Sequence, residues 1–303
     1  MQQVGRDIRI VDPHVHLWDL SRAHYAWLQD EPLPHNPAGD MSPIAHRDYG
    51  LADYRADTAG WTVDKIIHVE CGLPRGAQLA ETDWLQTLAD DSGFPQGIVA
   101  GADLLDPDLD ALLEAHAARR NVRGVRQIVC WHADPAKTYT ARDLLLDPAW
   151  EAGFARLARY GLSFDLQLYP SQMAAAAALA DRHPDIPLIV NHAGLPTDRD
   201  PAGIAAWRDG LRGLAARPQV SIKISGLGIT DRAWTRESIR PVALECIEAF
   251  GAGRAMFASD FPVDKVHGSF DAVFSAFDAI TADFSDDERE RLFAANAEAT
   301  YRI

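Results

Sequence analysis

The sequence has few cysteines and no long apolar run. Its 303 residues include three cysteines, Cys71, Cys130 and Cys246, without a C-x-x-C spacing. An odd number of scattered cysteines gives no disulfide framework, so we expect reduced thiols in a cytoplasmic protein. There is no run of 18 apolar residues, and the N-terminal stretch MQQVGRDIRI lacks the apolar core of a signal peptide. These absences argue against a membrane protein and against a secreted disulfide scaffold.

Positive charge is also scarce. Lysine and arginine number 29 against 44 aspartates and glutamates, which gives a net charge of −15. Nucleic acids and anionic membrane surfaces require a basic footprint, so we expect neither as a partner. The motifs G-x-G-x-x-G, G-x-x-x-x-G-K-[ST] and G-x-S-x-G are absent. We therefore expect no nucleotide cofactor and no serine nucleophile, and we expect activated water to be the attacking group.

Apolar residues are abundant, at 47% of the chain, and they are arranged in short runs that alternate with helix-like stretches. The predicted strands are residues 8–11, 65–70, 97–102, 124–129, 162–168, 187–192, 220–225 and 254–259. The predicted helices are residues 77–89, 108–119, 148–160, 172–183, 204–216, 236–250 and 285–301. Strands that alternate with helices pair in parallel through right-handed crossovers. Eight such units predict an α/β fold, a (β/α)8 TIM barrel in a single domain over residues 1–303.

The first unit is longer than the others. Residues 18–50 form an insert after the first strand, rich in proline, histidine, aspartate and aromatic residues. Loops of this length are uncommon in compact domains unless they have a function. We therefore expect the insert to decide substrate specificity.

Polar side chains follow the apolar run at the end of nearly every predicted strand. They are His14, His16, Glu70, Arg126, Gln167, His192, Lys223 and Asp260. The carboxyl ends of barrel strands share one face, where the active sites of this fold lie. The H-x-H pair adds a local argument, because residues i and i+2 of a strand point to the same side. Alone, such a pair suits a solvated strand end equally well, but the ordered set predicts one catalytic or metal site.

Seven segments between residues 11 and 264 extend this pattern to a family resemblance. They are VDPHVHLWD, HVECG, GVRQIV, LSFDLQL, LIVNHAG, VSIKISGL and MFASDFPVD. The ordered set resembles the amidohydrolase superfamily, and within it the amidohydrolase-related lactonases. That branch includes 2-pyrone-4,6-dicarboxylate lactonase and the fuconolactone and rhamnonolactone hydrolases. The resemblance implies a hydrolase that opens the lactone ring of a sugar acid or of an aromatic-degradation intermediate.

The chain departs from the metal-rich members of that superfamily at two positions. Those members usually carry a lysine or glutamate on strand 4 and a histidine on strand 5, where this chain has Arg126 and Gln167. Without a bridging ligand we expect at most one divalent ion, with Zn²⁺ held by His14, His16 and Asp260 and with Glu70 as a further oxygen ligand. The resemblance also covers lactonases without metal. In that case the two histidines would hydrogen-bond the substrate instead.

The predicted roles follow from side-chain chemistry at these positions. Asp260 is the general base, with a helix cap as its alternative, and His192 polarises the scissile carbonyl. Arg126 and Lys223 bind anionic or carbonyl groups, unless they only neutralise Glu70 and Asp260. Glu70, Gln167, Tyr169 and Trp18 complete the predicted substrate-binding set. His68 and Asn191 are interpreted as structural residues.

Two other functions remain open at the level of sequence. One is a metal-dependent decarboxylase of the amidohydrolase-related group, against which the glutamine at position 167 counts. The other is a non-catalytic barrel that binds a small molecule, since a fold does not fix a function. The expected partner is a small-molecule lactone, and the sequence leaves a homo-oligomer open.

Overall fold

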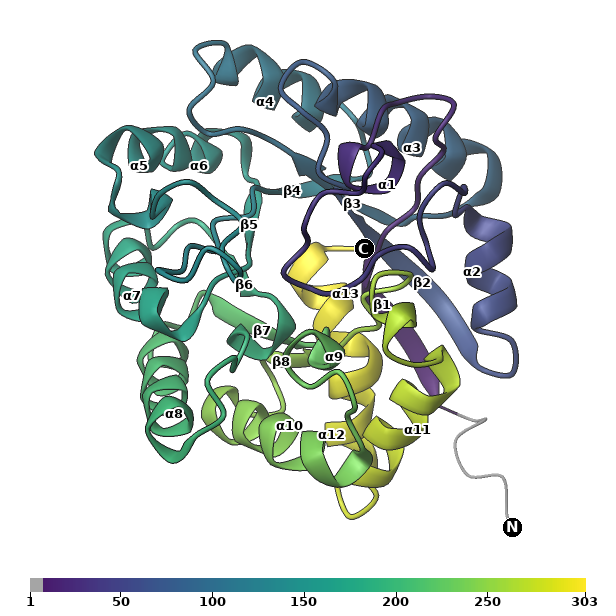
Figure 1. The fold of residues 1–303 in the computed structure, drawn as a ribbon, viewed down its shortest axis with the longest axis vertical. Coiled ribbons are helices and arrows are strands. Elements are labelled where there is room, and N and C mark those ends of the chain that lie inside the picture. The colour runs from purple at the N-terminus through teal and green to yellow at the C-terminus, as the bar shows by residue number, and fades with distance from the viewer. Residues whose placement is uncertain (1–7) are drawn as a thin grey trace.

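The computed structural model describes residues 8–303, which form eight parallel strands in a nearly closed barrel with helices around it (Figure 1). The strands pair in chain order and are β1 (Arg9–Val15), β2 (Thr62–Val69), β3 (Gly97–Gly101), β4 (Val122–Arg126), β5 (Ser163–Leu166), β6 (Leu188–Val190), β7 (Val220–Ile224) and β8 (Ala255–Phe257). A parallel bridge between Val15 and Phe261 joins the two ends of the sheet. The predicted (β/α)8 barrel is confirmed.

The helices fill the crossovers, but they differ from the prediction in several places. They are α1 (Ala26–Gln29), α2 (Leu51–Asp57), α3 (Gln78–Ser92), α4 (Leu109–Ala117), α5 (Pro148–Phe154), α6 (Leu157–Tyr160), α7 (Met173–Arg182), α8 (Pro201–Ala215), α9 (Leu227–Thr230), α10 (Arg236–Phe250), α11 (Phe270–Ile280), α12 (Asp286–Glu290) and α13 (Asn296–Tyr301). The predicted helix 148–160 is split into α5 and α6, and 285–301 is interrupted by a π-helical turn at Arg291–Ala295. Helix α11 was not predicted, although Ser269 caps it and its apolar residues recur every three to four positions.

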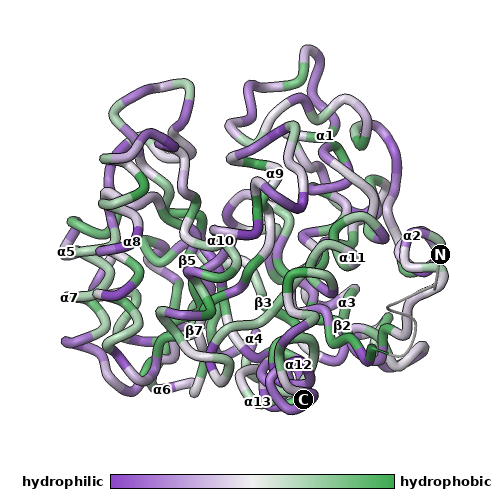
Figure 2. Tube along the Cα trace, turned by 90° about the horizontal axis from the view of Figure 1, so that it is seen from below, coloured by the Kyte–Doolittle hydropathy of each residue, from purple (hydrophilic) through white to green (hydrophobic). Residues whose placement is uncertain are grey.

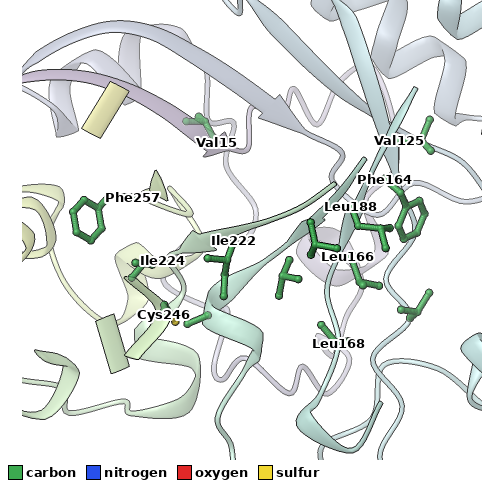
Figure 3. Packing of buried hydrophobic residues seen from close by; sticks show 14 of the residues in the cluster. Val15, Val125, Phe164, Leu166, Leu168, Leu188, Ile222, Ile224, Cys246 and Phe257 are labelled. Atoms are coloured by element: carbon green, nitrogen blue, oxygen red, sulfur yellow. The ribbon is translucent and has the colours of Figure 1, made fainter. Parts of the chain in front are cut away.

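Two hydrophobic layers separate the inside of the barrel from its outside. Figure 3 shows the outer layer, in which side chains such as Ile222, Ile224 and Phe257 leave the strands toward the helices. The inner layer contains Val11, Ile67, Val69, Val99, Ile189 and Met256 with three residues of the C-terminal segment, Ala294, Ala297 and Tyr301. Alternate residues of each strand therefore face the barrel axis, where Tyr301 helps to close one end.

The two ends of the barrel carry different segments. Helices α1 and α9 lie at one end, and α12 and α13 lie at the other (Figure 2). The insert 18–50 contains α1, and its two ends are held together by an antiparallel bridge between Trp18 and Tyr49. Among residues 8–303 every helix is too short or too polar to span a bilayer. The three cysteines are buried and unpaired.

Candidate active site

A cavity of about 400 Å³ opens at the barrel end that carries α1 and α9. It takes in six of the predicted side chains, His16, Glu70, Arg126, Gln167, His192 and Asp260. The remaining walls come from the insert, from the β4–α5 loop and from the segments after β2, β7 and β8: Trp27, His35, Asn36, Pro37, Ala38, Cys71, Gly72, Ile128, Thr138, Tyr139, Ile229 and Val263. The strand ends therefore supply most of the polar chemistry, while the loops supply most of the walls.

Asp260 lies at the bottom of this cavity, three residues beyond β8. Its backbone has φ of 61°, a left-handed conformation that few residues other than glycine adopt, and its N–H donates to the carbonyl oxygen of His14 at 2.9 Å. The carboxylate is 1% exposed, and burial raises its pKa above the usual 3.8. Its Oδ2 has no hydrogen-bond partner in the described part of the chain. A buried carboxylate oxygen without a partner is free to accept a proton.

The two histidines of the H-x-H motif converge on Asp260, as predicted. Nε2 of His14 lies 3.4 Å from Asp260 Oδ1, and Nε2 of His16 lies 3.3 Å from the same oxygen. The Nδ1 of His16 is 2.8 Å from the carbonyl oxygen of Val69. A carbonyl only accepts, so this nitrogen carries the proton and Nε2 of His16 presents a lone pair. Burial lowers the pKa of both rings well below 6.5, so both are neutral.

Arg126 forms a buried ion pair with Glu70. Its Nε donates to Glu70 Oε1 at 2.7 Å, and Nη2 donates to the Glu70 carbonyl oxygen at 2.7 Å. The other carboxylate oxygen of Glu70 accepts the N–H of Gly72 at 2.6 Å. Nη1 makes longer contacts, at 3.4 Å from Nε2 of His14 and 3.5 Å from the side-chain oxygen of Gln167. The charge of the guanidinium is therefore paired with Glu70, and Nη1 is the nitrogen that Glu70 leaves unused.

His192 stands on the opposite wall after β6. Its Nδ1 lies 3.1 Å from the hydroxyl of Ser225 and 3.9 Å from Asp260 Oδ2. Burial lowers the pKa of His192 to about 4, so the ring is neutral near pH 7. Gly226 is required here, because a Cβ at that position would lie 2.5 Å from Nδ1 of His192. His192 and Ala193 both have φ of 53°, which places backbone strain at the site.

Comparison with known proteins agrees with this geometry. The amidohydrolase family model matches residues 11–303. The chain belongs to the amidohydrolase family. It is 46% identical over 298 residues to an uncharacterised protein of Sinorhizobium fredii, covering 98% of this chain and 99% of that one. It is 30% identical to an L-fucono-1,5-lactonase of Burkholderia multivorans, covering 97% and 96% of the two chains.

A solved structure is similar over the same length. An amidohydrolase from Burkholderia multivorans with bound zinc superposes with a TM-score of 0.79 at 27% identity, covering 97% of this chain and 99% of the other. Membership of the family, together with the lactonase relative, makes this amidohydrolase an enzyme of the hydrolase class.

The residues of this amidohydrolase fit one divalent ion. Ligand atoms of His14, His192 and Asp260 lie within 4.8 Å of one another. His16 is the third predicted ligand, and its Nε2 lone pair faces the Asp260 carboxylate at 3.3 Å with no donor between them. Two acceptors at this distance favour a cation or a proton between them. The unpartnered Oδ2 of Asp260 offers a second oxygen. The structure thus adds His192 to the predicted ligands.

A second group of potential ligands lies beside the cavity, where the sequence suggested only a core histidine. His68, Cys71 and Glu81 bring their ligand atoms within 4.8 Å of one another. The backbone N–H of Leu17 donates to Nδ1 of His68 at 3.2 Å, so the proton of this ring is on Nε2. That nitrogen is the one that faces Glu81, at 3.8 Å. A protonated nitrogen cannot ligate a metal, so His68 acts as the predicted structural residue.

Three predicted substrate-binding residues, Trp18, Tyr169 and Lys223, are not part of the cavity lining in residues 8–303. Trp18 packs edge-on against Trp27 and donates its indole N–H to the Arg47 carbonyl oxygen. Tyr169 lies in a separate apolar cluster and donates its hydroxyl to the carbonyl oxygen of Lys137. Lys223 lies below the cavity, fully buried. In each case the polar tip finds a partner inside the protein, which holds the side chain away from the cavity.

The sequence reasoning missed residues that only the folded loops bring to the site. Trp27 and residues 35–38 line the cavity from the insert, which was predicted as a unit but not residue by residue. Tyr139 lines it from the β4–α5 loop, which has no periodic pattern. Asp165 was detectable, because it shares the inward parity of Gln167 in LSFDLQL.

Proposed function

We propose that this amidohydrolase opens the ring of a neutral lactone, of the sugar-acid type, by water that Asp260 activates. The observation that carries the proposal is the unpartnered Oδ2 of a buried carboxylate at the bottom of a 400 Å³ cavity. Ester hydrolysis requires a base at that place and a donor for the carbonyl oxygen. The L-fucono-1,5-lactonase relative supports the same reaction class.

The charge of the cavity favours a neutral substrate. Among the described lining residues, Arg126 is the one lysine or arginine side chain, and it is paired with Glu70 at 2.7 Å. Asp260 adds a carboxylate, so the lining carries excess negative charge. A dicarboxylated ring would find no free cation here, and its desolvation would cost free energy without compensation. The same argument counts against the decarboxylase alternative, whose substrates carry a carboxylate.

The reaction can be described through the protein's own groups. Asp260 Oδ2 takes a proton from water as the water oxygen bonds to the ring carbonyl carbon. Ser225 can donate its hydroxyl proton to Nδ1 of His192, which leaves Nε2–H of His192 to donate to the developing oxyanion. The carbon–oxygen bond of the ring then breaks, and Asp260 returns the proton to the leaving ring oxygen. The product is a hydroxy acid whose carboxylate the negative cavity repels.

The steps above use only groups of the protein, and a bound divalent ion would assist them. When bound at His14, His192 and Asp260, with His16 beside them, it would polarise the carbonyl oxygen and lower the pKa of water. Gln167 and the apolar walls formed by Trp27 and Tyr139 would hold the ring in place.

A lactone panel tests the proposal. Purified protein is assayed by pH indicator against L-fucono-1,5-lactone and related neutral sugar lactones, and against 2-pyrone-4,6-dicarboxylate, each with and without chelator. We expect acid release from neutral lactones with a higher kcat/KM than from the dicarboxylate. Faster turnover of the dicarboxylate would overturn the charge argument. Release of CO₂ from an aromatic acid would favour the decarboxylase, and binding without turnover would favour the non-catalytic alternative.

A further inference from the structure

Tyr139 differs from the other six tyrosines of the chain in the partner of its hydroxyl group. The hydroxyls that donate to an acceptor of the protein belong to Tyr25, Tyr49, Tyr54, Tyr160, Tyr169 and Tyr301. Within residues 8–303 the hydroxyl of Tyr139 has no such partner, although the side chain lines the cavity. A polar group in a cavity wall without a protein partner is left to bond water or a ligand.

The side chain of Tyr139 is held by contacts at its backbone and at its ring. Its backbone N–H donates to the carbonyl oxygen of Cys130 at 3.0 Å, and Thr140 Oγ1 donates to the same oxygen at 3.3 Å. The ring packs beside the cluster of Cys130, Tyr169 and Leu195. Burial raises the pKa of the Tyr139 hydroxyl well above 10, so the group stays protonated. The hydroxyl can therefore donate and accept a hydrogen bond without any change in charge.

Asn36, in the insert 18–50, offers a second unused polar group. Its Oδ1 accepts the backbone N–H of Ala38 at 2.9 Å. Since a backbone N–H only donates, this contact identifies the oxygen of the amide and leaves the NH₂ group on the other side. Within residues 8–303 that NH₂ group has no acceptor, and Asn36 lines the cavity. The turn thus fixes the amide while its two N–H donors stay unused.

The two loops that carry Tyr139 and Asn36 contact each other at the cavity. Nε2 of His35 lies 2.8 Å from the carbonyl oxygen of Ala136, and because a carbonyl only accepts, the imidazole donates. His35 is adjacent to Asn36 in the chain, and Ala136 precedes Tyr139 by three residues. The two unused groups therefore belong to the loop walls of the cavity, whereas Asp260 and the other reacting groups come from the strand ends.

The chemistry of these walls fits a ring that carries hydroxyl groups. Among the described lining residues, those contributed by the loops include no lysine, arginine, aspartate or glutamate. A hydroxyl both donates and accepts, so ring hydroxyls can pair with the Tyr139 hydroxyl and with the Asn36 amide. An unsubstituted ring would displace water from both groups and leave them unpaired, which lowers affinity.

We propose that Tyr139 and Asn36 are specificity-determining residues that hydrogen-bond the ring hydroxyls of the substrate, while Asp260 acts at the ring carbonyl. The site then selects a polyhydroxylated lactone over an unsubstituted lactone of the same ring size. This inference rests on the proposed function, because the ligand is the lactone that the site would hydrolyse. Neither residue takes part in the chemical step, so their loss should raise KM and leave kcat unchanged.

Two lactones with the same six-membered ring test the proposal. L-fucono-1,5-lactone carries ring hydroxyls, and δ-valerolactone carries none. For the wild type we expect kcat/KM to be at least about 100-fold higher for the sugar lactone. Tyr139→Phe should raise KM for the sugar lactone by about 5–100-fold and change KM for δ-valerolactone by less than about twofold. No preference in the wild type, equal losses on both lactones, or no loss in the variant would overturn the assignment.

A second variant and a matched control separate recognition from a folding defect. Asn36→Ser removes the amide donor but keeps an oxygen that can accept the N–H of Ala38. It should show the same selective loss, and Tyr139→Phe/Asn36→Ser should bring the two lactones to within about tenfold of each other. Tyr160→Phe removes a hydroxyl that donates to the Asp110 carbonyl oxygen at 3.2 Å, and it should keep wild-type kinetics on both lactones. A loss in Tyr160→Phe equal to that in Tyr139→Phe would overturn the assignment.

Lactams separate this inference from the proposed function. L-fucono-1,5-lactam and δ-valerolactam keep the two rings but resist hydrolysis, so isothermal titration measures recognition alone. We expect the sugar lactam to bind more tightly than δ-valerolactam, and Tyr139→Phe to weaken its binding by about 5–100-fold. If no lactone is hydrolysed, the proposed function fails, and this loss of lactam affinity still supports the role of Tyr139. Sugar-lactam binding that is absent, or that Tyr139→Phe leaves unchanged, would overturn the inference even where the lactones are hydrolysed.

Discussion

Two buried charged clusters lie within a few ångströms of each other in this barrel, and they differ in how completely their bonds are satisfied. The floor cluster consists of Asp165, Lys223 and Tyr301, and the charged atoms of its ion pair are matched by donors and acceptors. The mouth cluster consists of Asp260, His16 and His192, and it leaves Asp260 Oδ2 without a partner and His16 Nε2 facing a carboxylate. The two clusters are equally buried but differ in role. The floor cluster, whose polar atoms have partners, holds neighbouring groups in place, whereas the mouth cluster, with an unpartnered oxygen, is available for the reaction.

The largest effect is expected at the mouth. Asp260→Asn should lower turnover by about 10²–10⁴-fold, the scale of losing a general base. Its stability should hold or rise, because the replaced oxygen has no partner to lose. Steady-state kinetics and thermal unfolding check both statements. Asp57→Asn, which removes a surface partner of Lys265, serves as the control and should keep the wild-type rate. A near-normal rate in Asp260→Asn would remove this residue from the mechanism.

Substitutions in the floor cluster should lower the stability of the fold and not only the rate of the reaction. Lys223→Met leaves Asp165 buried without its cation, so the free energy of unfolding should fall by about 3–5 kcal/mol. The double variant Lys223→Met/Asp165→Asn should recover much of that loss, because no unpaired charge remains. Urea denaturation of the two variants measures the difference. A loss below about 1 kcal/mol in the single variant would show that the floor pair is not the support described here.

Arg126 lines the same cavity, and its fork geometry can be tested apart from its charge. Arg126→Lys keeps one positive charge but cannot reproduce the paired bonds to the carboxylate and carbonyl of Glu70. We expect Nη1, which Glu70 does not use, to bond the substrate; losing one such charge-assisted hydrogen bond costs about 1.5–3 kcal/mol, so kcat/KM should fall by roughly ten- to a hundredfold. We expect the change mainly in KM. Wild-type kinetics in both Arg126→Lys and Arg126→Met would assign the residue a purely structural role.

The apolar wall of the mouth should contribute less than its charged groups. Trp27 lines the cavity and donates its indole N–H to the Cys71 carbonyl oxygen at 2.8 Å. Trp27→Ala should raise KM by about tenfold, since about 1.4 kcal/mol of binding is lost, and should leave kcat unchanged. Trp27→Phe keeps an aromatic wall and should lie between the two. A selective loss of kcat instead would mean that the insert acts in the chemical step.

The smallest effect is expected at the partly exposed ion pairs of Glu298 with Arg9 and Lys65. The bonds to Arg9 and Lys65 lower the pKa of Glu298 from 4.5 to about 2. A lowered carboxylate pKa stabilises the folded state above the unfolded value of 4.5, and the contribution is lost as pH falls from there through about 2. Glu298→Gln should therefore be slightly less stable than wild type at pH 7 and nearly equal to it at pH 2. Urea midpoints at the two pH values test this, and an equal difference at both would be inconsistent with the lowered pKa.

The sequence predicted the barrel because period and order are local properties. Each strand is a short apolar run, and alternation with helices is enough to imply parallel pairing and a shared face for His16, Glu70 and Asp260. The exceptions had local causes as well. Helix α11 carries a clear apolar repeat, and the predicted helix 148–160 breaks after Phe154 in spite of its continuous pattern.

The sequence by itself determined which chemistry is present: two imidazoles in H-x-H, a carboxylate after the last strand, and an arginine and a glutamine where a second metal would need other ligands. Only the tertiary structure decided which of these groups are free to act. In the sequence, Lys223 suggests a substrate-binding cation, but in the fold it forms a buried ion pair with Asp165, 58 residues away. His14 and His16 are equivalent in the motif, but Nδ1 of His16 meets the carbonyl oxygen of Val69, whereas Nδ1 of His14 meets the side-chain nitrogen of Lys223. Partners distant in sequence settle charge and tautomer, because both depend on which donors and acceptors surround a group in space.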